Sequence, residues 1–146
     1  MTIVLERARA DDRAAVEALV AASGLPLEGL AEAFDRCAIA RDASGAIVGA
    51  AAIEQYGDAG LLRSVAVAEG TRGTGVGRAV VAAAEDLARD DGITELYLLT
   101  ETAIDWFPRL GYTVVTREEA SAAVGASIEF TTVCRDTGVP MRKRLG

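Results

Sequence analysis

A short apolar strand leads into a glycine-rich turn and a helix at Val65-Ala66-Val67-Ala68-Glu69-Gly70-Thr71-Arg72-Gly73-Thr74-Gly75-Val76-Gly77-Arg78. Glycines at the alternate positions 73, 75 and 77 leave successive backbone N–H groups uncovered by side chains. The helix that follows adds about half a positive charge at its N-terminus. This pattern predicts a cradle for a phosphate group, and the alternative is a plain glycine-rich turn.

The spacing of these glycines excludes two common nucleotide motifs. A dinucleotide-binding fingerprint needs its third glycine three positions after the second, whereas Gly77 follows Gly75 by two. A P-loop needs lysine and then serine or threonine after its last glycine, and Gly77 is followed by Arg78. A different phosphate-containing ligand is therefore expected.

Short apolar runs bounded by turn residues predict a sheet. Turns at residues 42–45 and 57–60 separate three successive strands, which should form an antiparallel meander. A β–α–β unit follows, so its two strands should lie parallel. The predicted strands are 3–5, 37–41, 47–56, 61–68, 94–100, 112–115 and, as a closing edge strand with Pro140, 139–145.

Apolar residues recur at helical spacing from Gly75 to Asp91, and Gly92 ends that helix. Asp11 is the expected N-cap of an earlier helix, which ends before Gly24. Two shorter helices are expected over 27–36 and 102–109, whereas 117–135 carries only a weak helical signal.

The composition is that of one globular domain. The chain has 146 residues, of which 51% are hydrophobic and 25% are charged, and its net charge is −7. That charge has the wrong sign for a protein that neutralises nucleic acid phosphates. No apolar run approaches the roughly 18 residues that span a membrane, and no signal-peptide pattern opens the chain. We therefore expect a cytoplasmic protein with no nucleic acid or membrane partner.

The chain contains no histidine. This removes the commonest general base, the commonest metal ligand and every Ser-His or Cys-His nucleophile. The two cysteines, Cys37 and Cys134, are too few for a disulfide framework or a zinc site. No metal is therefore expected.

Residues 72–77, Arg-Gly-Thr-Gly-Val-Gly, match the Arg/Gln-x-x-Gly-x-Gly/Ala signature of the GNAT family of acyl-CoA-dependent N-acetyltransferases. Residues 103–112 resemble the family's Ala-x-x-Phe-Tyr-x-x-Leu-Gly-Phe element. The resemblance covers roughly residues 47–115. It implies one α/β (α+β) domain over residues 1–146, with a mixed, mostly antiparallel sheet of six to seven strands flanked by about four helices.

The resemblance also implies acetyl-CoA as cosubstrate, admitted where two central strands splay apart. Backbone amides of residues 73–78 would hold its pyrophosphate, and residues 65–67 would pair with its pantetheine arm. A strand bulge near Val65 would free an amide for the thioester carbonyl. The expected cofactor-binding residues are Val65, Ala66, Val67, Arg72, Gly73, Thr74, Gly75, Val76, Gly77, Arg78 and Phe107.

The catalytic residues depart from the family pattern. Many members place a tyrosine, as an acid for the departing thiol, where this chain has Phe107. The usual base positions fall around Leu61 and Arg63, and neither side chain can accept a proton. Glu54 and Glu101 are the candidates for a base or amine anchor, and a water chain to bulk solvent is the alternative.

Arg63 should point either toward the acceptor pocket or directly away from it. Toward the pocket, its guanidinium suits a carboxylate or oxyanion of the substrate. We therefore predict a small amino-acid-like amine as the acceptor. The alternative is a structural pairing of Arg63 with Glu54 or Glu101.

Shorter strings at 62–67, 98–102, 106–111 and 129–134 resemble a GNAT subgroup associated with arsenic-resistance gene clusters. That resemblance implies detoxification of an amino-acid-like toxin by acetylation. Two other functions stay open: a CoA-binding module with weak or no catalysis, and a protein acetyltransferase acting on lysine or N-termini. A homodimer and a lid over residues 117–138 are also left open.

Overall fold

The computed structural model describes residues 2–125 and 138–146. Within them one seven-stranded sheet has the order β1-β2-β3-β4-β5-β7-β6. Its strands are β1 (Val4–Arg7), β2 (Cys37–Arg41), β3 (Ile47–Tyr56), β4 (Ala59–Val67), β5 (Glu95–Thr100), β6 (Thr113–Val114) and β7 (Val139–Arg144). The helices are α1 (Arg13–Ala22), α2 (Leu30–Ala33), α3 (Val76–Asp90) and α4 (Arg117–Val124). The mostly antiparallel sheet flanked by four helices is thus confirmed.

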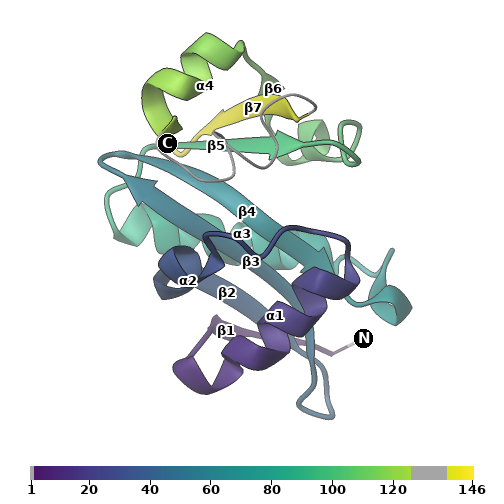
Figure 1. Cartoon of the computed structure of the whole chain (residues 1–146). Coiled ribbons are helices and arrows are strands. Elements are labelled where there is room, and N and C mark those ends of the chain that lie inside the picture. The colour runs from purple at the N-terminus through teal and green to yellow at the C-terminus, as the bar shows by residue number, and fades with distance from the viewer. Residues whose placement is uncertain (1, 126–137) are drawn as a thin grey trace.

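Helices cover both faces of the sheet (Figure 1). The apolar stripe of α3 packs on one face against residues of β2 to β5 and β7. On the other face, α1 and α2 pack against β2, β3 and β4, and α4 packs against the start of β4 and β5. Every strand from β2 to β5 is therefore buried on both sides. None of the helices in the described part of the chain is long and apolar enough to cross a membrane.

Strands β4 and β5 run parallel, as predicted, but they pair only at their beginnings. Residues 59–61 of β4 pair with residues 95–97 of β5. Beyond these pairs β4 continues to Val67 and β5 continues to Thr100 without further pairing between them. The expected splay between two central strands is confirmed, and it sets the position of the cavity described below.

A bulge interrupts the pairing of β3 with β4. Ala50 pairs with Ala66 and Ala52 pairs with Arg63, so Ser64 and Val65 together oppose a single residue of β3. The backbone of Ser64 has φ of 57°, in the left-handed region. A bulge of this kind shifts the alternation of side chains between the faces. The bulge expected near Val65 is therefore present.

The turn predicted over residues 57–60 is too long. Tyr56 pairs with Ala59, so Gly57 and Asp58 alone connect β3 to β4. Gly60 lies inside the strand, where a Cβ would come within 2.9 Å of the side chains of Ile53 and Leu96. This glycine allows close packing and does not reverse the chain.

The prediction of an edge strand at the C-terminus is wrong. β7 lies between β5 and β6, and the two-residue β6 is the edge. Pro140 has no N–H to donate, but its carbonyl accepts the N–H of Val115 at 3.0 Å. A proline is tolerated at this position because only its acceptor is used.

Three helix predictions also need correction. The helix predicted over 102–109 is only a 3-10 turn, η4 (Phe107–Leu110). The one predicted over 27–36 divides into α2 and the 3-10 turn η2 (Phe34–Arg36). The N-cap position of α1 is Asp12 and not Asp11, and no side chain caps this helix. The carboxylate of Asp12 instead accepts the backbone N–H of Arg9 at 2.9 Å, and this bond holds the pKa of Asp12 below its usual value.

Candidate active site

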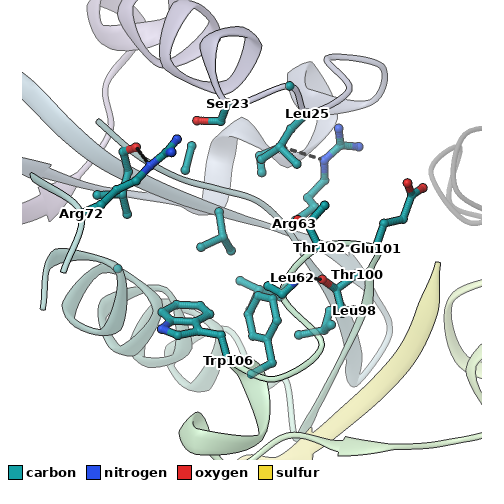
Figure 2. Close-up of a pocket in the computed structure, with 18 of the residues that line it drawn as sticks. Ser23, Leu25, Leu62, Arg63, Arg72, Leu98, Thr100, Glu101, Thr102 and Trp106 are labelled. Atoms are coloured by element: carbon teal, nitrogen blue, oxygen red, sulfur yellow. Dashed lines mark hydrogen bonds between the residues drawn. The ribbon is translucent and has the colours of Figure 1, made fainter. Parts of the chain in front are cut away.

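A cavity of about 1080 Å³ opens where β4 and β5 diverge. Its wall combines the connection from α1 to α2 (residues 23–26), β4 (62–67), the glycine-rich turn with the start of α3, the end of β5, and the segment 101–109. Figure 2 shows Arg72 and Arg63 at opposite ends of this cavity, with Trp106 in the wall between them. Segments far apart in the sequence therefore meet at one site.

The N-terminus of α3 faces the cavity without a side-chain cap. Gly73 and Gly75 have φ of 80° and 88°, which glycine adopts without strain. A Cβ at Gly77 would lie 3.1 Å from Cζ2 of Trp106. The first N–H groups of a helix have no intrahelical acceptor, and the helix dipole favours an anion beside them. The start of α3 can thus accept a phosphate.

The cavity wall is positively charged although the chain as a whole is acidic. Among its described residues it contains four arginines and one acidic residue, Glu101. Arg72, whose Nε donates to the carbonyl of Val67 at 3.4 Å, stands beside the glycine-rich turn with Arg78. This local charge suits a ligand with several anionic groups. The arginines are Arg63, Arg72, Arg78 and Arg109.

Nine of the eleven predicted cofactor-binding residues line the cavity, and two do not. Thr74 donates its hydroxyl to the carbonyl of Thr71, and the side chain of Val76 packs in a core cluster with Ala40 and Val48. The nine are Val65, Ala66, Val67, Arg72, Gly73, Gly75, Gly77, Arg78 and Phe107.

Arg63 lines the cavity and also forms a buried ion pair. Its Nη1 donates to Oε2 of Glu54 at 2.8 Å, its Nε to Oγ of Ser64 at 3.2 Å and its Nη2 to the carbonyl of Pro26 at 3.3 Å. The hydroxyl of Tyr56 donates to the other oxygen of Glu54. The exposed fractions of the two charged side chains are 0% and 8%. The structural pairing of Arg63 with Glu54, predicted as the alternative to a role in substrate binding, is therefore present.

The two candidate bases lie in different places. Glu54 is behind Arg63 and is not part of the cavity wall. Glu101 follows the end of β5, is exposed, and lines the cavity on the side of Arg63 (Figure 2). The structure therefore brings Glu101, and not Glu54, to the cavity surface.

Gly29 closes the far side of the ion pair. Its φ is 83°, and a Cβ there would lie 2.5 Å from Nη1 of Arg63 and 3.3 Å from Oε2 of Glu54. The chain between α1 and α2 can pass over the pair only because this residue has no side chain.

Aromatic residues form one apolar wall of the cavity. The ring of Phe107 makes edge-to-face contacts with Trp106, at 4.9 Å, and with Tyr112, at 5.7 Å. Tyr112 does not replace the tyrosine that Phe107 lacks, because it lies outside the cavity wall and donates to Glu85 at 2.9 Å. Burial raises the pKa of Tyr112 above its usual value.

Cys37 is not a candidate nucleophile. Its side chain is fully buried, and burial raises the pKa of its thiol to about 12, so it stays protonated near neutral pH. Cys134 and the string 129–134 lie outside the described residues, as does most of the segment considered as a lid.

Several wall residues were not found from the sequence. Residues 23–26 reach the cavity only through the tertiary packing of α1, and Ser64 carries no sequence signal of its left-handed backbone. Arg109 lies inside the second motif, between Pro108 and Leu110, and its place in that motif could have identified it as a residue of the site.

Residues 33–114 match the family model described as an acetyltransferase (GNAT) domain. A curated protein of Chlorobaculum tepidum, the uncharacterized N-acetyltransferase CT2212, is 35% identical over 78 residues, which make up 53% of this chain and 50% of that protein. The chain thus spans about half the length of this curated relative.

Solved structures share the fold. N-acetylglutamate synthase from Neisseria gonorrhoeae, complexed with coenzyme A and N-acetyl-glutamate, has a TM-score of 0.83 and 21% identity, over 100% of this chain and 36% of its own. Rv2747 from Mycobacterium tuberculosis, in complex with CoA, has a TM-score of 0.77 and 26% identity, over 97% of this chain and 98% of its own. Since the family model covers more than half of the chain, the protein belongs to the GNAT acetyltransferase family.

Proposed function

We propose that this protein is an acetyl-CoA-dependent N-acetyltransferase that acts on the primary amine of a small, amino-acid-like molecule. The observation that carries the proposal is the uncapped start of α3, which opens with three glycines onto a cavity between diverging strands. Structures of similar fold contain coenzyme A.

The residues present fit an acyl-CoA. The N–H groups of residues 73 and 75–78 would hold the pyrophosphate, supported by Arg72 and Arg78, whereas the N–H of Thr74 already donates to the carbonyl of Thr71 at 3.3 Å. Residues 62–67 of β4 lack a partner strand on the β5 side, so their backbone can pair with an extended arm. The bulge at Ser64 and Val65 leaves backbone groups outside the β3 ladder, near the site of reaction. Acetyl-CoA supplies the acetyl group as an activated thioester when bound.

Arg63 would hold an anionic group of the acceptor. Its guanidinium lies beside residues 23–26, on the face opposite α3. Glu54 engages one side of the guanidinium and so fixes its orientation, which suits a planar carboxylate. The synthase of similar fold is complexed with N-acetyl-glutamate, an acetylated amino acid.

Glu101 is the proposed proton acceptor for the amine. It is the acidic residue among the described residues of the cavity wall, and it lies on the side of Arg63. Both carboxylate oxygens of Glu54 already accept hydrogen bonds, from Arg63 and Tyr56, so we assign Glu54 to positioning Arg63. With Phe107 in place of a tyrosine, the thiol would leave as a thiolate.

Binding of coenzyme A is expected to change the fluorescence of Trp106. It is the single tryptophan of the chain, and its indole lies over Gly77 at the cavity wall. Titration with coenzyme A should give a saturable fluorescence change with the same midpoint as the heat measured by calorimetry. The Trp106→Phe variant should lose the signal and keep the heat. Absence of both signals in the unmodified protein would refute the proposed function.

Replacing Arg63 with alanine is expected to raise the KM for the amine acceptor by about 10-fold or more, because a charge-assisted hydrogen bond to substrate is lost. The KM for acetyl-CoA, measured in the same preparation, should change by less than about 2-fold. Release of thiol from acetyl-CoA with a panel of small primary amines provides the assay. An unchanged acceptor KM would remove the role of Arg63.

The proposal extends to detoxification of amino-acid-like compounds in the cytoplasm, in the setting of arsenic resistance. The strings 62–67 and 106–111, which resemble that subgroup, both contribute to the cavity wall. The amine panel should therefore include amino-acid-like toxins. A protein substrate is the competing possibility, and turnover of peptides with no turnover of small amines would favour it.

A further inference from the structure

Ser64 adopts a backbone conformation that serine rarely adopts. Among the residues that the structure describes, it is the one residue other than glycine with a positive φ, at 57°. It lies in the bulge of β4, where glycine would fit without strain. A strained residue that persists at a ligand site points to a use for its side chain.

The hydroxyl of Ser64 is available as a donor toward the cavity. The residue is 8% exposed and contributes to the cavity wall. Its Oγ accepts the Nε–H of Arg63 at 3.2 Å, so one lone pair of Oγ faces the guanidinium and the O–H bond must point elsewhere. Within residues 2–125 and 138–146 the hydroxyl of Ser64 donates no hydrogen bond of its own. A buried donor of this kind requires a partner.

The hydroxyl faces the same part of the cavity as Arg63. Leu62 and Val65 pack with the core under α3, whereas the guanidinium of Arg63 reaches Pro26 on the opposite face. Because Nε of Arg63 also reaches Oγ of Ser64, the two side chains share that face. The bulge makes this possible, since adjacent residues of a regular strand point to opposite faces.

We propose that the hydroxyl of Ser64 donates a hydrogen bond to the carboxylate of the acceptor, beside the guanidinium of Arg63. The two side chains form a clamp that selects a carboxylate over a neutral carboxamide. Donation from Arg63 polarises the hydroxyl and makes it a stronger donor to an anion. This inference rests on the proposed function, and it adds the group that distinguishes a charged acceptor from a neutral one.

The test compares twenty L-amino acids with their α-carboxamides as acceptors for the unmodified protein, Ser64→Ala and Ser64→Gly. Both variants remove the hydroxyl, but only glycine relieves the backbone strain. A change in the acceptor KM that both variants share is therefore caused by loss of the hydroxyl. The unmodified protein should prefer the acids. Both variants should raise the KM for the best acid by about 10-fold, with kcat and the KM for acetyl-CoA within about 2-fold and the KM for its amide unchanged.

Several results would overturn the clamp. A fall in kcat with an unchanged acceptor KM would assign the hydroxyl to the chemical step. A change in the acceptor KM in Ser64→Ala that is absent in Ser64→Gly would show that the backbone conformation, and not the hydroxyl, is the cause. Equal use of acids and amides by the unmodified protein would remove the selectivity. Coenzyme A binding without turnover of any of the twenty amino acids would also contradict the clamp, whereas absence of coenzyme A binding would contradict the proposed function itself.

Discussion

The Gly75→Val variant is expected to bind coenzyme A at least about 100-fold more weakly than the unmodified protein. Gly75 has φ of 88° and precedes the first residue of α3. A β-branched residue does not adopt this φ without strain, so the turn that presents the N–H groups of α3 would change shape. Isothermal titration calorimetry with coenzyme A measures the effect.

Gly45 offers a matched control for this variant. It has φ of 87°, no atom lies within 4 Å of a Cβ built on it, and it belongs to the turn between β2 and β3, outside the cavity wall. Gly45→Val should lower the free energy of unfolding by about as much as Gly75→Val, on the order of 1–3 kcal/mol, and leave the Kd for coenzyme A unchanged. If both variants lose binding equally, general destabilisation explains the result and the phosphate cradle is not supported.

The glycine-rich turn shows why part of the site was predictable from sequence. Its signals are local: alternate glycines supply left-handed backbone, and a helix follows at once. The β–α–β order then fixes parallel strands on either side, because such crossovers have one favoured hand. These two features place the cavity at the ends of β4 and β5 without any knowledge of packing.

The position of β7 was not predictable in the same way. A strand with Pro140 is typical of an edge, and nothing local indicates that a two-residue β6 covers it. Strand order depends on contacts between residues far apart in the chain, and these leave no periodic signal. The same holds for residues 23–26, which become part of the cavity wall only after α1 packs on the sheet.

The pairing of Glu54 with Arg63 could be predicted from the sequence even though the predicted turn between β3 and β4 was too long. A four-residue turn over 57–60 would put Glu54 directly opposite Arg63, whereas the observed two-residue turn pairs Glu54 with Leu61 and leaves Arg63 diagonal to it. A register error of two residues keeps every side chain on its face, because the period of a strand is two. Nothing in the sequence predicts the left-handed backbone of Ser64, since the position of a bulge depends on the pairing of both strands.

Replacing Arg63 with methionine is expected to lower the free energy of unfolding by about 3 kcal/mol. The variant leaves the carboxylate of Glu54 buried without the guanidinium that balances its charge. The exposed fraction of the Glu54 side chain is only 8%. Methionine preserves much of the side-chain volume, so the loss of packing is small. Urea denaturation followed by circular dichroism measures the change.

The double variant Arg63→Met/Glu54→Gln tests whether the uncompensated charge is the cause. Glutamine keeps an oxygen that can accept the hydroxyl of Tyr56 and removes the negative charge, so at least half of the lost stability should return. Arg89→Met is the matched control, because Arg89 pairs with Asp86 at 2.9 Å with exposed fractions of 41% and 74%, and its loss should cost less than about 0.5 kcal/mol. A loss below about 1 kcal/mol in Arg63→Met, or no recovery in the double variant, would show that the buried pair does not hold this side of the cavity together.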